Sequence, residues 1–151
     1  MSTKKTFRMK AGTVKGDPCG RSLGIGRADR AWLVRLVRKG FRYSRLKKFQ
    51  KATGLPMEKI AGLTRISPRT LVRRQNEGRL RPDESDRVLR VSRVFDLALD
   101  LFEGDVASAR LWLETPQAGL GGEVPLELAS TEIGAREVEG LITRLEHGVF
   151  A

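Results

Sequence analysis

The chain has 151 residues, of which 40% are hydrophobic, and this is enough to form one ordinary domain or two small ones with a buried core. No apolar run approaches the roughly 18 to 20 residues of a membrane span, and no apolar segment follows the charged N-terminus, so we expect a cytoplasmic protein without membrane segment or secretory signal. Charge is unevenly distributed: residues 1–93 carry 26 Lys or Arg against 7 Asp or Glu, whereas residues 94–151 carry 3 against 11.

This uneven charge predicts two modules with different partners. The first part has a net charge of +19, which suits nucleic acid because displaced counterions supply much of the binding affinity. The second part has a net charge of −8 and would be repelled by the same phosphates. We therefore expect one module that faces nucleic acid and one that faces another partner.

Residues 1–26 are predicted to form a flexible basic arm. They contain scattered glycines, five Lys or Arg before Gly16 and no sustained apolar periodicity. Such an arm could contact phosphates, but a solvated tail is the simpler interpretation.

Two helices are predicted after the arm. The first, over about residues 28–39, carries an apolar stripe and ends at Gly40, which suits a C′ position. The second is expected to be capped by Ser44 and to end at Gly54. The stripe of the first helix consists of Trp32, Leu33, Leu36 and Val37.

The next two helices have the spacing of a helix-turn-helix. A helix of about eight residues, PMEKIAGL, starts near Pro56 and is followed by the short connection TRIS and by a second helix that begins at Ser67. This pattern predicts that the second helix is a DNA-recognition helix. The small core shared by the two helices is expected to consist of Ile60, Ala61, Ile66 and Leu71.

The predicted recognition helix, SPRTLVRRQNEGRLR, has strong start signals. The Ser67 hydroxyl can cap it, and Pro68 suits the first helical position, where no donor is missed. Leu71 is expected to form its apolar back, with Val72 as a candidate second member. The predicted DNA-binding residues are Ser67, Arg69, Thr70, Arg73 and Arg74.

The side chains of this helix suggest separate roles. Arg69 and Arg73 are the candidates for bidentate bonds to guanine, and Thr70 could contact a thymine methyl group or a phosphate. Positioning on the DNA backbone is expected of Arg74, Arg79 and Arg81. A helical bundle with a basic surface and no DNA ligand remains the alternative.

A longer, bridging helix is predicted after Leu80, ending at Gly104 and buried on more than one side. Acidic residues occupy its first turn, where they oppose the helix dipole. Its apolar positions are Val88, Val91, Val94, Phe95, Leu97, Ala98, Leu101 and Phe102.

Three further helices are expected in the acidic part. Asp105 should cap the first, the second should be short and span 125–129, and the last should begin near Thr131. The apolar face of the last helix consists of Val138, Leu141, Ile142, Leu145 and Val149. Its other face carries Glu132, Glu137, Glu139 and Glu146.

The sequence shows no sign of catalysis. One histidine, His147, and one cysteine, Cys19, are too few for the usual zinc sets, and no nucleophile elbow accompanies the histidine. The glycines at 119, 121 and 122 lack a following P-loop lysine and are interpreted as backbone-shaping residues. We expect no enzymatic activity, no catalytic residue, no metal site and no cofactor.

Three separated blocks resemble one known family. They are ISPRTLVRRQNEGRLRPDESDRVLRVSRVF, the run A-x-x-WL-x-x-P-x-x-x-LGG-x-x-P-x-x-L at 109–128, and the ending L-x-x-R-L-E-H-G-V-F at 141–150. From about Gly24 onward the chain resembles the Xre/MbcA/ParS-type antitoxins, which are encoded beside toxins carrying the RES domain. The resemblance implies an all-α protein whose helix-turn-helix domain binds operator DNA and represses its own operon. It also implies a C-terminal domain that binds an NAD-degrading toxin.

Composition, charge and the resemblance together divide the chain into an arm (1–26), a helix-turn-helix domain (27–93) and a small helical toxin-binding domain (94–151). The resemblance implies that the chain end covers the NAD pocket of the toxin through Glu146, His147, Gly148, Val149, Phe150 and Ala151. The structural alternative is that Val149 and Phe150 only complete the last apolar face. A homodimer is expected because one recognition helix covers few base pairs. The alternative function is a stand-alone helix-turn-helix transcriptional regulator.

Overall fold

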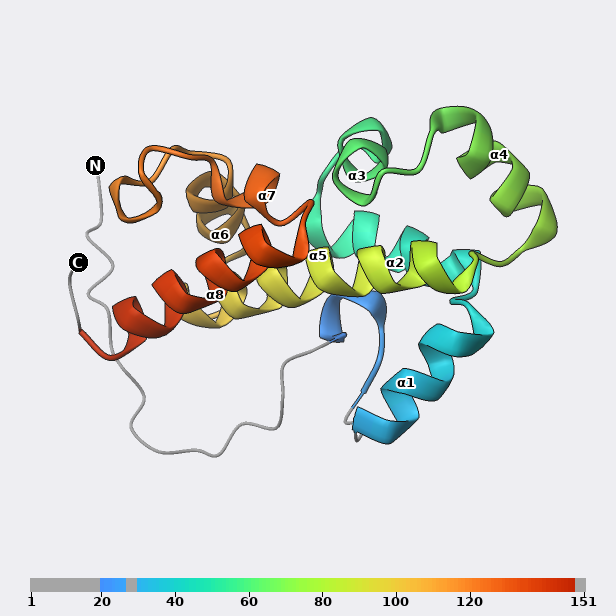
Figure 1. Ribbon diagram of the computed structural model, residues 1–151, viewed down its shortest axis with the longest axis horizontal. Coiled ribbons are helices and arrows are strands. Elements are labelled where there is room, and N and C mark those ends of the chain that lie inside the picture. The colour runs from blue at the N-terminus through green and yellow to red at the C-terminus, as the bar shows by residue number, and fades with distance from the viewer. Residues whose placement is uncertain (1–19, 27–29, 149–151) are drawn as a thin grey trace.

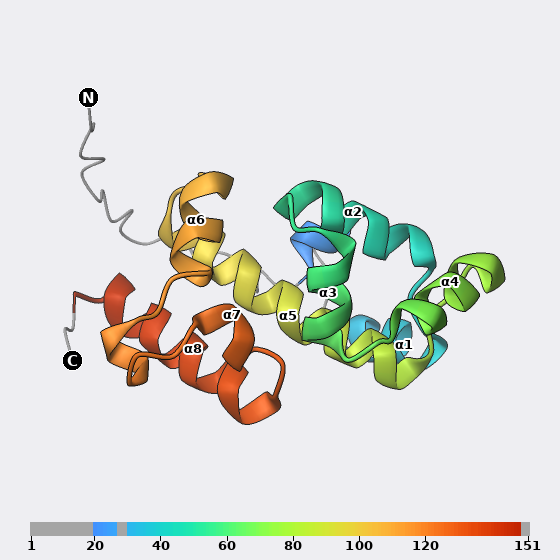
Figure 2. The same cartoon turned by 90° about the horizontal axis from the view of Figure 1, so that it is seen from above.

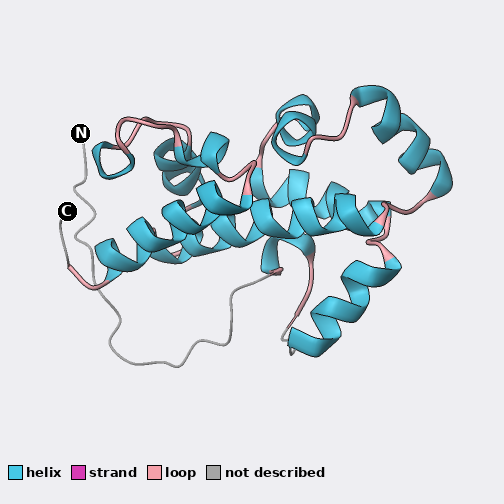
Figure 3. Ribbon diagram, in the orientation of Figure 1, coloured by secondary structure: helices cyan, strands magenta, loops and turns pink. Residues whose placement is uncertain are grey.

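The computed structural model describes residues 20–26 and 30–148, which form helices joined by loops and turns (Figure 3). The all-α fold class predicted from the sequence is confirmed for them. Extended pairing among these residues amounts to two isolated bridges. The elements are η1 (Arg21–Leu23), α1 (Arg30–Lys39), α2 (Tyr43–Thr53), α3 (Met57–Thr64), α4 (Pro68–Glu77), α5 (Pro82–Leu101), α6 (Val106–Leu113), η2 (Ala118–Leu120), α7 (Pro125–Leu128) and α8 (Glu132–Glu146).

Helix α5 is the element that joins the two parts of the molecule. In Figures 1 and 2 it runs between α1, α2 and α3 on one side of the molecule and α6, α7 and α8 on the other. Its predicted burial on several sides is confirmed, because Val88, Val91, Val94, Phe95 and Ala98 are fully buried. Among the described residues, no helix combines the length and apolarity that crossing a membrane requires.

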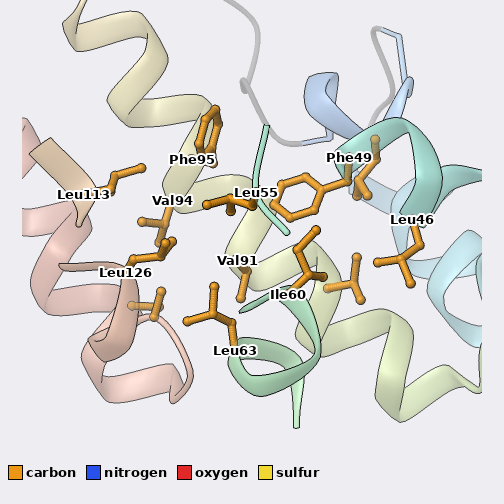
Figure 4. Packing of buried hydrophobic residues seen from close by; sticks show 14 of the residues in the cluster. Leu46, Phe49, Leu55, Ile60, Leu63, Val91, Val94, Phe95, Leu113 and Leu126 are labelled. Atoms are coloured by element: carbon orange, nitrogen blue, oxygen red, sulfur yellow. The ribbon is translucent and has the colours of Figure 1, made fainter. Parts of the chain in front are cut away.

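One continuous core covers both parts. Phe95 of α5 meets Phe49 of α2 edge to face, with ring centroids 6.2 Å apart. Figure 4 shows Val94 of α5 among Leu113 of α6 and Leu126 of α7, on the other side of the same helix. The two modules predicted from charge therefore share one apolar core through α5.

The loop before α2 is clamped to the loop after α4. The Leu80 N–H donates to the Phe41 carbonyl at 2.8 Å, and Arg42 and Arg79 form an isolated bridge. Arg79 also donates from Nη1 to the Gly40 carbonyl at 2.7 Å. Gly40 adopts φ +81°, and a Cβ there would collide with the Leu80 carbonyl oxygen. Glycine is therefore required at this junction, which fixes the C-terminal end of α4.

The end of the predicted arm is ordered, contrary to expectation. Residues 20–26 form a hook that packs against α2 and α5, and Leu23 and Ile25 are buried in the core. Two backbone N–H groups of the hook bond the buried Asp96 on α5. In the sequence, Leu23 and Ile25 alternate with glycines over too short a stretch to be recognised as an element. The hook could therefore not be predicted from the sequence. The part of the predicted arm before residue 20 lies outside the described residues.

The Asp96 carboxylate is the anchor of the hook. The Gly20 N–H donates to Oδ2 and the Ser22 N–H to Oδ1, each at 3.2 Å, while Arg21 pairs with Asp100 at 2.7 Å. Burial raises the pKa of Asp96 to about 6, although these donors and the Arg21 charge act in the opposite direction. The attachment of the hook therefore involves a carboxyl group whose ionisation changes in the mildly acidic range.

Most of the helix starts agree with prediction, with one exception. Asp105 and Thr131 cap α6 and α8 through their side chains, as expected. Ser44 does not cap α2, which already begins at Tyr43, with Arg42 at the N-cap and no side-chain cap bond. The contacts between the loop before α2 and the loop after α4 set this start. They hold the buried Tyr43, which precedes the predicted cap Ser44 by one residue.

Candidate DNA-binding helix and partner-binding end

The turn between α3 and α4 is tight and well packed. Arg65 ends α3 in the left-handed conformation at φ +53°, a position that glycine usually occupies, and the Ile66 N–H returns to the Ala61 carbonyl at 3.0 Å. Ile66 then inserts into the core beside the two helices. The predicted shared core is confirmed, because Ile60, Ala61, Ile66 and Leu71 are all buried.

The predicted start of α4 is confirmed in detail. Ser67 Oγ accepts the Thr70 N–H at 3.1 Å, and Pro68 occupies the first helical turn. The Ser67 hydroxyl also bonds the Thr70 hydroxyl at 2.9 Å. In that bond Ser67 donates and Thr70 accepts, and Thr70 is half-buried, which limits its reach toward a ligand.

The outward face of α4 is cationic. Arg69 and Arg73 are exposed, and α4 lies at the outer edge of the molecule in Figure 1. A helix that projects in this way, with two free-standing planar guanidinium groups, has the shape and charge that the DNA major groove accepts.

Arg74 has to be removed from the predicted DNA-binding set. It is only 2% exposed, and its Nε bonds Glu84 Oε1 of α5 at 2.6 Å while Nη1 pairs with Glu77 at 3.2 Å. Burial would raise the pKa of the Glu84 carboxyl, but hydrogen bonds from Arg74 and from the Arg81 N–H outweigh it and lower that pKa. Arg74 therefore attaches α4 to α5 and does not face a ligand.

Val72 is the second residue of α4 whose position differs from the prediction. It is 59% exposed, whereas the sequence made it a candidate for the apolar back of the helix. The buried side is formed by Leu71 and Arg74 instead. The helical period could have indicated the exposure of Val72, because adjacent residues lie about 100° apart around a helix and Leu71 is on the buried side.

Helix α8 packs along α5, and charges help to hold it there. Arg93 Nε bonds Glu139 Oε1 at 2.6 Å, and Arg90 Nε bonds Glu132 Oε2 at 3.0 Å. Two acidic residues on the face opposite the predicted apolar face are thus ion-paired with the bridging helix. The apolar face is confirmed, with Val138, Leu141 and Ile142 buried and Leu145 partly buried.

The predicted partner-binding end starts at the last turn of α8. Glu146 is the last helical residue, His147 is the C-cap with its N–H bonded to the Thr143 carbonyl at 3.1 Å, and Gly148 turns with φ +69°. His147 and Gly148 are exposed. The C-terminal end of α8 and helix α4 lie at opposite ends of the molecule (Figures 1 and 2). The remaining predicted residues, Val149, Phe150 and Ala151, lie outside the described residues.

The glycine-rich connection has the structural role that was predicted. Gly121 and Gly122 adopt φ +68° and +86°, and a Cβ at Gly119 would press on the Leu141 side chain. In the part of the chain that the structure describes, no group of three or more His, Cys, Asp or Glu residues is placed to hold a metal ion.

Two protein-family models match the chain. The Antitoxin Xre-like helix-turn-helix domain matches residues 33–93, and the Antitoxin Xre/MbcA/ParS C-terminal toxin-binding domain matches residues 97–148. The boundary between these matches falls in α5, beside the position at which the charge of the sequence changes sign.

Curated proteins named Antitoxin Xre are similar over most of the chain. One from Yersinia enterocolitica is 41% identical over 132 residues, covering 87% of this chain and 89% of the relative. One from Photorhabdus laumondii is 34% identical over 139 residues, covering 91% and 94%. A third, from Pseudomonas putida, is 26% identical over 117 residues, covering 78% and 64%.

Proposed function

The chain belongs to the Xre antitoxin family, and from this premise we propose that it acts in the cytoplasm on two partners. It neutralises a cognate RES-domain toxin that degrades NAD, by covering the toxin's active site with its C-terminal end. It also represses its own operon through α4. The proposed role is binding, without catalysis or a cofactor.

The DNA-binding part of this proposal rests on the exposed cationic face of α4. The capped start, the tight turn after α3 and the exposed Arg69 and Arg73 are what a recognition helix requires. Arg69 and Arg73 would read guanine, while the exposed Ser67 and the half-buried Thr70 lie at the N-terminal end of the helix, beside the DNA. A homodimer would present two copies of α4 to a two-fold operator, since one helix covers few base pairs.

The toxin-binding part is supported by the position and charge of the second half. Residues 94–151 have a net charge of −8, which complements a cationic pocket that receives a dinucleotide. The end of α8 is remote from α4, so a toxin there would leave the DNA-binding face open. Residues 146–151 are the proposed occluding segment. The RES identity of the toxin rests on the sequence resemblance.

Separation of the two functions tests the proposal. The double variant Arg69→Ala, Arg73→Ala should lose repression of a reporter fused to its own promoter, yet still restore growth when co-expressed with the toxin. The variant Arg136→Ala, which removes an exposed arginine from α8, serves as the matched control and should keep both activities. Full repression by the double variant would show that another surface binds the operator.

A stand-alone transcriptional regulator is the second candidate. It would use the same α4 but would need no acidic partner domain. The neighbouring reading frame distinguishes the two: an adjacent RES-type toxin supports the antitoxin, and a neighbour of unrelated type favours the regulator.

A further inference from the structure

Val72 is an apolar side chain on α4 that the core does not use. It is 59% exposed, while its neighbour Leu71 is buried. An exposed valine does not favour the helix either, because its branched Cβ restricts the side chain and gives it a lower helix propensity than alanine or arginine. Neither core packing nor helix formation therefore accounts for a valine at this position.

Helical geometry places Val72 on the same outward face as the two arginines. With about 100° per residue, the buried Leu71 and Arg74 point in a mean direction roughly 170° away from Arg69. Val72 lies about 60° to one side of Arg69 and Arg73 about 40° to the other. The outward face thus carries an apolar group beside two guanidinium groups.

This combination matches the edges of bases better than it matches the phosphates of the DNA backbone. Phosphates offer only charged oxygen atoms, whereas in the major groove thymine presents a C5-methyl group that apolar side chains contact, and guanine presents the acceptors that arginine binds. Val72 is about 4.5 Å from Arg69 along the helix axis, which is close to the spacing of about 3.4 Å between stacked bases. A methyl group near the arginine-bound base is therefore within reach.

Building on the proposed operator binding, we propose that Val72 is a specificity-determining residue that contacts the C5-methyl group of a thymine near the base read by Arg69. The sequence suggested Thr70 for a thymine. Thr70, however, is half-buried and its hydroxyl is bonded to Ser67, whereas Val72 is exposed on the outward face.

Replacement of thymine by uracil tests this contact, because it removes only the methyl group. Operator duplexes with one thymine replaced at a time are titrated by fluorescence anisotropy with the full chain and with Val72→Ala. For the full chain, one thymine position in each half-site should weaken binding about fourfold on replacement, the factor for one buried methyl group. Val72→Ala removes the contact from both half-sites, so it should bind the unmodified operator about sixteenfold more weakly, and it should be insensitive to uracil at that position.

The control is Val34→Ala, which removes a comparably exposed valine from α1 and should behave like the full chain. Circular dichroism should show that both variants keep their helices, since both side chains are exposed. Equal uracil sensitivity of Val72→Ala and the full chain at every thymine would overturn the contact, as would a full chain that tolerates uracil everywhere. A full chain that binds operator and scrambled DNA equally would instead refute the operator-binding function, and this assignment with it.

Discussion

Helices α4 and α8 are both attached to α5, but in different ways. Helix α8 lies along α5 through a long apolar seam, with ion pairs at its edge. Helix α4 buries little more than Leu71 and the guanidinium of Arg74, and its other face is free for a ligand. The comparison shows that a charged helix face reveals a binding site only after its tertiary partners are known, because charges on both helices turn out to be structural.

Phe95→Ala should have the largest effect on stability, and on both parts together. Phe95 is fully buried and packs edge to face against Phe49, so its truncation should cost about 4 kcal/mol. Because α5 carries one continuous core, α1 on one side of it and α6 on the other, which hold Trp32 and Trp112, should unfold in a single transition. Urea unfolding followed by fluorescence of Trp32 and Trp112 measures it. Two separate transitions would contradict the shared core.

Glu84→Ala should be the next most harmful change. It removes the Glu84 carboxylate, which lies 2.6 Å from Nε of the buried Arg74. Breaking a buried ion pair costs about 3 kcal/mol. Operator binding should weaken with it, because α4 loses its attachment to α5. The free energy of unfolding from urea titration is the readout, and a loss below about 1 kcal/mol would mean that the pair does not hold α4.

Asp96 should make the protein less stable at neutral than at acidic pH. Its pKa is about 6 in the folded chain, whereas an unperturbed aspartate has a pKa of about 3.9, so the folded state binds the proton more tightly than the unfolded state. The stability contributed by the protonated form is complete below about pH 4 and is lost as the pH rises through 6, by roughly 2 to 3 kcal/mol. The stability of Asp96→Asn should not show this loss. If the free energy of unfolding changed with pH in the same way for the full chain and for Asp96→Asn, the assignment of this loss to Asp96 would be contradicted.

Glu139→Ala should have the smallest effect and is the matched comparison for Glu84→Ala. Its bond to Arg93 is also 2.6 Å long, but the two side chains are 25% and 29% exposed, against 6% and 3% for Glu84 and Arg74. Solvent screening should limit the loss to below about 1 kcal/mol. An equal loss for the two variants in the same urea titration would show that burial does not decide the strength of these pairs.

Much of the fold follows from local signals in the sequence. Ser67, Asp105 and Thr131 cap their helices as predicted, because an N-cap needs only the residue and its two or three successors. The α3–α4 core and the burial of α5 follow from helical periodicity. The outward direction of Arg69 and Arg73 could be predicted for the same reason.

The remaining features depend on contacts between distant residues. The hook is fixed by Asp96, more than seventy residues away, and Arg74 is buried only because Glu84 of another helix meets it. The exposure of Val72 depends on how α4 is rotated against α3, and one position along the helix separates the buried from the exposed face. Sequence alone therefore predicted a cationic helix with Arg69 and Arg73 facing outward, but not the exposure of Val72 or the burial of Arg74.

The most direct test is the rate of NAD consumption by the purified cognate toxin, titrated with the full chain and with a chain that ends at Arg144. Occlusion predicts that the full chain stops NAD consumption at stoichiometric ratios. The shortened chain, which keeps most of α8 and its seam with α5, should leave the toxin active. Full inhibition by the shortened chain would contradict the account, because it would place the inhibitory contact elsewhere than at the C-terminal end.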